Sequence, residues 1–220
     1  MTWTRRDALK GLGGIPILGA VWWAGAASTV AKKKERSAIL EQLNIQPSLP
    51  PAVQGIGGEP VRVGIIGFGI RGEQLCRAMG FATKEWIESM EIAASEAKAE
   101  GKEHTALKDF KAQEKLNIKL VGVCDVFDYR AKKAIASFST KETIVKRYKT
   151  HQEMIRSANV DAVVIATPDH WHAPMTIDAL ENNIHVYVEK PMTHTVEETY
   201  RLREAAKNSK AILQIGHQHR

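Results

Sequence analysis

Cysteine is scarce in this chain of 220 residues, which contains only Cys76 and Cys124. Their spacing indicates neither a disulfide framework nor a cysteine metal site. We therefore expect two buried thiols without a cross-link. Internal repeats are absent as well, so the chain is not an array of repeated structural units.

The formal net charge of the chain is +6, but most of the chain has no excess of positive charge. Residues 1–36 hold seven Lys and Arg against two Asp and Glu, and so contribute +5 of that charge. The remainder is close to neutral, which argues against a basic surface for nucleic acid. We predict no nucleic-acid partner.

Residues 1–36 have the organisation of an export signal, which we treat as a leader outside the fold. Arg5 and Arg6 precede an uncharged apolar stretch, 11–31, that contains the small-residue run 24–28. The adjacent arginines resemble a twin-arginine signal, which a receptor reads and which is not itself an anchor. We predict an exported, periplasmic protein that meets the membrane only through this signal. An N-terminal membrane anchor is the alternative, because the apolar stretch is long enough to span a bilayer.

A linker and one globular domain follow the leader. Seven prolines and glycines interrupt residues 37–60, where no periodicity survives. From 61 to 220, apolar runs alternate with helical patterns, which predicts an α/β fold with a doubly wound parallel sheet of Rossmann type. The predicted strands are 61–66, 118–124, 161–166, 185–189 and 211–216, with a short one near 144–148, and the predicted helices are 70–80, 128–138, 151–157, 172–182 and 195–209.

Two local patterns refine this prediction. Thr195 and Glu198 have the spacing of a capping box at the start of the last helix. Residues 81–117 separate the first helix from the second strand and contain a helical run followed by an Ala/Glu/Lys-rich stretch. We interpret this segment as a solvated helical insertion, with a substrate lid or an oligomer contact as alternatives.

The glycine-rich turn after the first strand is the most informative motif. It has the G-x-G-x-x-G pattern after a strand and before a helix, the context that dinucleotide binding requires. Gly67 makes the tight bend, Gly69 lets the backbone approach a pyrophosphate, and Gly72 lets helix and strand pack closely. The start of the following helix favours a phosphate. The predicted cofactor contacts of this turn are Gly67, Phe68, Gly69, Ile70, Arg71 and Gly72.

Asp125 ends the second predicted strand, where an acidic side chain typically binds the ribose hydroxyls of adenosine. A carboxylate there repels a 2′-phosphate, so NAD is favoured over NADP. Arg130 is close enough in the sequence to weaken that preference. Alternatively, Asp125 only caps the helix that begins near Asp128.

Polar and aromatic residues follow the next strands at the same edge of the predicted sheet. Residues 167–172 read Thr-Pro-Asp-His-Trp-His, and their two histidines have no convincing third metal ligand. We therefore predict no metal site, although a four-histidine site with His217 and His219 remains an alternative. Lys190 follows the fifth strand between Glu189 and a proline that fixes the turn, through a cis bond in one interpretation.

Lys190 is the predicted catalytic residue. At the sheet edge it would hydrogen-bond a substrate hydroxyl, or donate a proton if burial lowers its pKa. The alternative is a surface salt bridge between Lys190 and Glu189.

Taken together, these motifs resemble the Gfo/Idh/MocA family, which includes glucose-fructose oxidoreductase and inositol dehydrogenase. The resemblance rests on G-F-G-I-R-G at 67–72, C-D at 124–125, A-T-P-D-H-W-H at 166–172 and E-K-P at 189–191, and it covers residues 61–220. It implies a nicotinamide cofactor and hydride transfer at a sugar or polyol carbon. The positions that the resemblance assigns to the nicotinamide half and the substrate are Thr167, Pro168, Trp171, His172, Glu189 and Lys190.

The chain also departs from the family pattern. The insertion 81–117 is longer than the usual connection, and the family's second α/β domain, with its catalytic histidine and most sugar contacts, would have to follow residue 220. We expect the chain to bind the dinucleotide but to turn over substrate poorly by itself, and the full-length protein to be a homo-oligomer. The alternative functions are an NAD-dependent glycosidase of the N-acetylgalactosaminidase-like branch and a non-catalytic exported NAD-binding protein.

Overall fold

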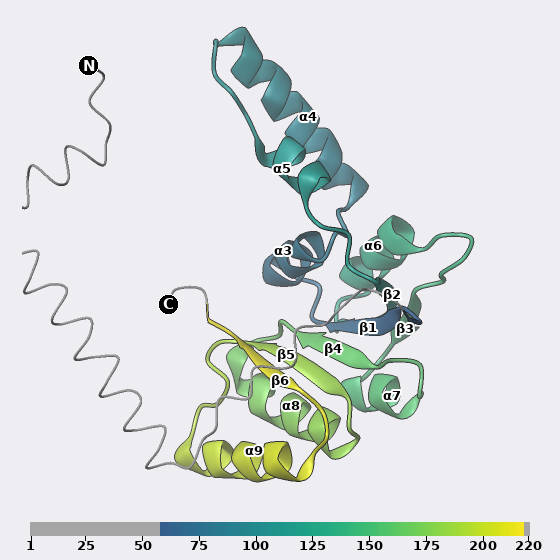
Figure 1. Cartoon of the computed structure of the whole chain (residues 1–220), viewed down its shortest axis with the longest axis vertical. Helices are drawn as coiled ribbons and strands as arrows, with labels where there is room; N and C mark the ends of the chain where they lie inside the picture. Colours follow the sequence, from purple (N-terminus) through teal and green to yellow (C-terminus); the bar gives the residue numbers. More distant parts are fainter. Residues whose placement is uncertain (1–57, 218–220) are drawn as a thin grey trace, which may run out of the picture. The chain divides into compact units, whose positions relative to one another are not determined.

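A computed structural model describes residues 58–217, and within them six strands form one parallel sheet (Figure 1). The strand order is β3-β2-β1-β4-β5-β6. The predicted doubly wound α/β fold is therefore confirmed. The strands are β1 (Val61–Ile66), β2 (Ile118–Cys124), β3 (Lys146–Tyr148), β4 (Ala162–Ile165), β5 (His185–Glu189) and β6 (Leu213–Gly216).

Helices connect the strands and cover both faces of the sheet (Figure 1). They are α3 (Ile70–Ala78), α4 (Lys84–Ala99), α5 (Ala106–Ala112), α6 (Asp128–Phe138), α7 (His151–Arg156), α8 (His172–Glu181) and α9 (Val196–Asn208), with a 3₁₀ turn, η1 (Asp169–Trp171). Most of the predicted helices and strands match these bounds to within two residues at each end.

Two hydrophobic clusters hold the helices on the sheet, one on each face. On one face, Leu75 of α3 and Ala134 of α6 pack with Ile65 of β1. On the other face, Met154 of α7 and Leu180 of α8 pack with the opposite side of the strands. Because both faces are covered, the central strands β1, β2 and β4 are largely apolar, as is typical of parallel sheets. Both cysteines lie buried in these clusters as free thiols, as expected.

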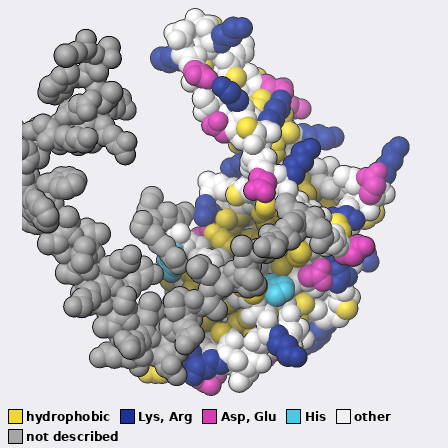
Figure 2. All heavy atoms as spheres, viewed as in Figure 1, with side chains coloured by type: hydrophobic (Ala, Val, Ile, Leu, Met, Phe, Trp, Pro, Cys, Tyr) yellow, Lys and Arg dark blue, Asp and Glu magenta, His cyan; other side chains and the backbone are white. Residues whose placement is uncertain are grey.

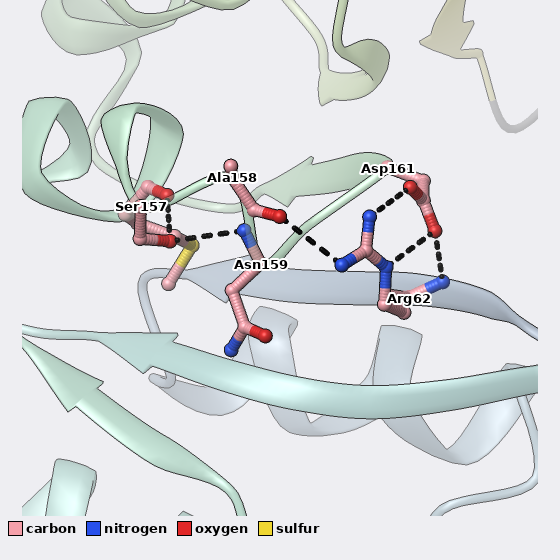
Figure 3. A network of polar contacts seen from close by, with 6 residues as sticks. Arg62, Ser157, Ala158, Asn159 and Asp161 are labelled. Carbon is pink, nitrogen blue, oxygen red and sulfur yellow. Dashed lines mark hydrogen bonds and ion pairs between the residues drawn. The ribbon is translucent and has the colours of Figure 1, made fainter.

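An ion pair ties the start of β1 to the start of β4 (Figure 3). The Arg62 guanidinium donates to both carboxylate oxygens of Asp161, at 2.6 and 3.0 Å, and to the Ala158 carbonyl oxygen at 3.1 Å. The Arg62 backbone N–H also donates to Asp161 Oδ2 at 2.8 Å. The Asp161 backbone also bonds to Arg62 and His185 on the neighbouring strands, and β4 begins at Ala162, one residue later than predicted.

The insertion between α3 and β2 is a pair of helices, α4 and α5, in which no residue is buried. Trp86 of α4 packs edge-on against Phe110 of α5, and the Arg77 guanidinium of α3 lies 5.1 Å from the centre of the Trp86 ring. Charged side chains of both signs cover the visible face of the pair (Figure 2). The prediction of a solvated helical insertion agrees with this exposure.

The ends of two helices follow from their capping residues. The Thr195 side chain accepts the Glu198 N–H, and the Glu198 carboxylate accepts the Thr195 N–H, which is the predicted capping box of α9. Thr150 caps α7 in a similar way by accepting the Glu153 N–H. Of the helices that the structure describes, none is long and apolar enough to cross a membrane. The predicted leader and almost all of the predicted linker lie outside the described residues.

Candidate functional site

A pocket of about 380 Å³ opens at the carboxyl ends of the central strands. It lies where β1 has β2 on one side and β4 on the other, which is the point in an open α/β sheet where ligands bind. The lining residues come from the ends of β1 and β2, from the segments that follow β1, β2, β3 and β4, and from helices α6, α7 and α8. They are Ile66, Gly67, Gly69, Cys124, Asp125, Val126, Phe127, Arg130, Lys149, Thr150, His151, Gln152, Ala166, Thr167, Pro168, Trp171 and Met175.

The glycine turn is packed so closely that side chains are excluded at two positions. Gly67 has φ +86°, and a Cβ there would lie 2.7 Å from the Ala166 carbonyl oxygen. A Cβ on Gly72 would lie 2.1 Å from the carbonyl oxygen of Gly67. Gly69, by contrast, would meet only the Arg130 guanidinium, at 3.4 Å. Gly69 thus leaves space on the pocket side, directly before the N-terminus of α3.

The other residues of the turn point in different directions. The Phe68 side chain is fully buried and packs edge-on against Phe138, so it belongs to the core. Ile70 is exposed and does not line the pocket. Arg71 leaves the turn toward β5, where it contacts Glu189.

The Asp125 carboxylate is buried against the glycine turn. Its Oδ2 accepts the Phe68 N–H at 2.7 Å, and its Oδ1 accepts the Phe127 N–H at 2.8 Å. Each oxygen can accept a further hydrogen bond from a ligand in the pocket. Asp125 does not cap α6 in the way the alternative interpretation required, because the N-cap residue of that helix is Phe127.

Cations also border this pocket. The Arg130 guanidinium lies over the Phe127 ring, 4.9 Å from its centre, and Lys149 follows β3 at the same edge. The pocket therefore combines one buried carboxylate, that of Asp125, with two exposed cationic side chains.

Sequence reasoning missed the wall that residues 149–152 form. His151 is buried there, and its Nε2 lies 2.7 Å from Asp178 Oδ2, so the ring is held in place from α8. The Trp171 ring lies 6.4 Å from the His151 ring and completes this side of the pocket. A usable signal was present, because residues that follow a predicted parallel strand lie at the carboxyl edge of the sheet, where ligands bind, and 149–152 follow the predicted strand 144–148.

A second pocket of about 320 Å³ adjoins the first, and the two share Ala166 and Thr167. Its other lining residues come from the glycine turn, from the segment after β4 and from the end of β5. They are Arg71, Asp169, His172, Glu189, Lys190 and Pro191. The structure thus brings together side chains of residues 71, 167, 172, 189 and 190, which the sequence analysis assigned to one site.

Glu189 pairs with Arg71 and not with Lys190. Its carboxylate is 7% exposed, and its Oε1 lies 2.6 and 2.8 Å from two nitrogens of the Arg71 guanidinium. The alternative of a Lys190–Glu189 salt bridge is therefore wrong. Lys190 is exposed at the pocket rim, so the structure does not supply the burial on which its proton-donor role depended.

His172 is buried between two loops. Its Nδ1 lies 2.6 Å from the Pro191 carbonyl oxygen, and its Nε2 lies 2.9 Å from the Thr167 carbonyl oxygen. Since both ring nitrogens are engaged with backbone, the ring joins the segment after β4 to the segment after β5. The Lys190–Pro191 bond in that second segment is cis.

No cluster of three or more His, Cys, Asp or Glu side chains within residues 58–217 is arranged to hold a metal ion. His219, one member of the alternative four-histidine site, lies outside the described residues. His194 instead contacts Asp169, with its Nε2 3.1 Å from Oδ2, and this bond holds the pKa of the Asp169 carboxyl below its ordinary value.

The model of an oxidoreductase family with an NAD-binding Rossmann fold, Gfo/Idh/MocA, matches residues 61–217. The chain belongs to this family. The match spans the sheet and both pockets, and it is the family that the four sequence motifs resemble.

Individual relatives match over shorter stretches. A glycosyl hydrolase family 109 protein of Shewanella woodyi is 38% identical over 60 residues, which are 27% of this chain and 13% of the relative. An inositol 2-dehydrogenase of Salmonella typhimurium is 32% identical over 100 residues, 45% of this chain and 29% of the relative. The chain therefore matches well under half of either protein.

A similar solved structure is the myo-inositol dehydrogenase of Lactobacillus casei in complex with NAD(H) and myo-inositol. Its TM-score is 0.51 at 20% identity, and the match covers 71% of this chain and 36% of that one. At this identity the likeness establishes the shared fold. The chain spans about a third of that enzyme's length.

Proposed function

We propose that this chain is the N-terminal, dinucleotide-binding part of an NAD-dependent oxidoreductase that acts on a hydroxyl of a sugar or polyol. The observation that carries the proposal is the glycine turn, which opens into α3, is hydrogen-bonded to the buried Asp125 carboxylate, and lines one pocket together with it. Family membership supports the same chemistry.

The residues of the first pocket fit the adenosine diphosphate half of NAD. Gly69 leaves room for a pyrophosphate beside the N-terminus of α3, whose free N–H groups and partial positive charge favour an anion. Asp125 retains acceptor capacity for the ribose hydroxyls. We assign Pro168 and Trp171 to the wall next to the nicotinamide ribose.

NAD is the proposed cofactor rather than NADP, because the Asp125 carboxylate would repel a 2′-phosphate. Arg130 and Lys149 oppose that effect from the pocket rim. Fluorescence titration with NADH and NADPH tests the preference. We expect Asp125→Ala to weaken NADH binding and narrow the difference between the two nucleotides. Equal or tighter binding of NADPH by the unmodified chain would refute the Asp125 argument.

The second pocket is the proposed place of the nicotinamide and of the reacting hydroxyl. NAD supplies a hydride acceptor there, and the role of this chain is to orient the hydroxyl and move its proton. We assign the hydroxyl contact to Lys190, which lines the pocket from the cis turn after β5.

Lys190→Ala tests that assignment in the full-length protein. We expect turnover to fall while NAD affinity stays within about twofold, because the reacting hydroxyl loses the hydrogen bond that orients it. A fall on the order of 10²- to 10⁴-fold, typical of general acid–base assistance, would further require that bound substrate buries the Lys190 amine, which is exposed in this structure. A collapse of NAD affinity would make Lys190 a cofactor or structural residue. An unchanged turnover would refute its role.

A glycosidase that uses NAD transiently is the second candidate, because a family 109 glycosyl hydrolase is among the relatives. The two candidates differ in their products. An oxidoreductase converts NAD to NADH in proportion to substrate, whereas this glycosidase releases a sugar with no net change in NAD. Absorbance at the NADH band together with reducing-sugar release therefore distinguishes them. Binding of NAD with neither product would indicate the non-catalytic alternative.

We further propose that the protein is exported by the twin-arginine route to the periplasm and acts there as a homo-oligomer. This route carries folded proteins, which suits an enzyme that acquires NAD before export. We expect the double change Arg5→Lys with Arg6→Lys to retain the precursor in the cytoplasm on fractionation. Unchanged export would favour a general signal or a membrane anchor.

A further inference from the structure

Arg71 lies inside the glycine turn, yet its guanidinium is directed at the opposite side of the site. Its Nε donates to Glu189 Oε1 at 2.8 Å, a terminal nitrogen lies 2.6 Å from the same oxygen, and Nη1 donates to Gln74 at 3.1 Å. The partners Arg71 and Glu189 are 118 residues apart in the sequence. This bond connects the proposed pyrophosphate turn to the second pocket.

The Glu189 carboxylate is held from one side only. Besides Arg71, the Tyr187 hydroxyl donates to Oε1 at 3.3 Å, and burial together with the Glu189 charge raises the pKa of that hydroxyl. No donor within residues 58–217 contacts the other oxygen, Oε2. Since Glu189 lines the second pocket, Oε2 is the oxygen left for a ligand.

Packing at the end of β6 restricts this arrangement further. A Cβ on Gly216 would lie 2.5 Å from the Tyr187 hydroxyl oxygen and 3.0 Å from Glu189 Oε1. The strand backbone therefore sits directly against the two side chains. The contacts to Oε1 and this packing together hold the Glu189 carboxylate between Arg71, Tyr187 and the end of β6.

We propose that Arg71 is a positioning residue, which fixes Glu189 so that Oε2 accepts a hydrogen bond from the neutral carboxamide of the nicotinamide. The inference rests on the proposed function, because it requires NAD in the site. It also gives the site a chemical preference. A carboxamide presents N–H donors to Oε2, whereas a carboxylate in the same place would be repelled by Glu189.

Three nucleotide probes test this in the 220-residue chain by calorimetric titration: NAD, nicotinic acid adenine dinucleotide, and ADP-ribose. We expect the unmodified chain to bind NAD roughly tenfold more tightly than the nicotinic acid analogue, the scale of a hydrogen bond to a charged group. Glu189→Gln should reduce this preference to within about threefold. ADP-ribose lacks the ring, so its affinity should stay within about twofold.

Arg71 variants separate positioning from direct phosphate binding. Arg71→Met should lose the NAD preference but retain ADP-ribose affinity, and Arg71→Lys, which keeps the charge, should restore part of the preference. Arg62→Met is the matched control, because it removes another Arg–carboxylate pair. That pair lies at the amino ends of β1 and β4, opposite the pockets, so its loss should change none of the three affinities. Thermal melts verify that each variant is folded.

Three results would overturn the inference. Equal loss of NAD and ADP-ribose affinity in Arg71→Met would make Arg71 a phosphate ligand. Equal affinity of the unmodified chain for NAD and the nicotinic acid analogue would mean that Oε2 does not face the carboxamide. Binding of none of the three probes would refute the proposed function itself, and the inference with it.

Discussion

The surroundings of Gly72 and Gly69 predict different effects for the same substitution to alanine. Gly72→Ala should mainly lower stability, and Gly69→Ala should mainly weaken NADH binding. In Gly72→Ala, the new methyl group would lie 2.1 Å from the Gly67 carbonyl oxygen, although Cβ atoms essentially never approach another atom within 3.0 Å. Either α3 or the turn must therefore move by about 1 Å. In Gly69→Ala, the nearest atom is a guanidinium nitrogen of Arg130 at 3.4 Å, which the flexible side chain can accommodate.

The magnitudes follow from this geometry. Overpacking at Gly72 costs about 1–3 kcal/mol, and the better helix propensity of alanine offsets up to about 1 kcal/mol of that. We expect Gly72→Ala to lower the free energy of unfolding by roughly 1–2 kcal/mol, or the Tm by roughly 3–6 °C for a domain of this size. Gly69→Ala should cost less, roughly 0.5–1 kcal/mol, because Gly69 is the N-cap of α3 and alanine is a poorer N-cap than glycine.

Binding reverses the order of the two variants. The Gly69 methyl group would occupy the space that we assign to the pyrophosphate, so NADH affinity should fall at least about tenfold, or about 1.4 kcal/mol. Urea unfolding followed by circular dichroism, together with NADH fluorescence titration, measures both quantities. The reasoning is refuted if Gly69→Ala destabilises the fold as much as Gly72→Ala does, or if Gly69→Ala binds NADH normally.

Two further predictions concern thiols and pH. Burial raises the pKa of Cys76 to about 12 and that of Cys124 to about 11. At pH 8 a disulfide reagent should therefore label the folded chain at least roughly a hundredfold more slowly than the chain in urea. Comparable labelling rates would contradict the burial of the two thiols. The Arg62 guanidinium holds the pKa of the Asp161 carboxyl below its ordinary value, so the pair stabilises the fold above the ordinary pKa of about 4 and loses this effect as pH falls through the lowered value. Arg62→Met should therefore lower the free energy of unfolding only slightly at pH 7, since both side chains are partly exposed. The deficit should shrink as the pH falls below about 4, as urea unfolding over this pH range would show; a deficit independent of pH would mean that the arginine acts through packing.

Local patterns in the sequence were sufficient to predict the order and type of the strands and helices. β-branched runs such as 61–66 indicated buried parallel strands, and the Thr195–Glu198 spacing indicated where α9 begins. These features depend on neighbours in the chain, so residue type and spacing reveal them. The position of Asp125 beside the glycine turn followed from the general rule for parallel sheets.

Pairings between distant side chains were beyond such reasoning. Residue type and spacing do not show that Glu189 pairs with Arg71 and not with the adjacent Lys190. That choice depends on the directions in which two turns leave the sheet. The wall at 149–152 was missed for a related reason. The short strand β3 was predicted, but residue type and spacing do not show which side chains after it face the pocket.

The two margins of the sheet differ in how they would meet another chain. β3 closes one margin with Lys146 and Arg147, and charged residues on an edge strand discourage further strand pairing. β6 lies at the other margin, pairs with β5, and has the uncharged sequence Leu-Gln-Ile-Gly. Its outer backbone groups are therefore the better template for an added strand. In concentrated solution, self-association of this chain should proceed through β6 and depend little on salt.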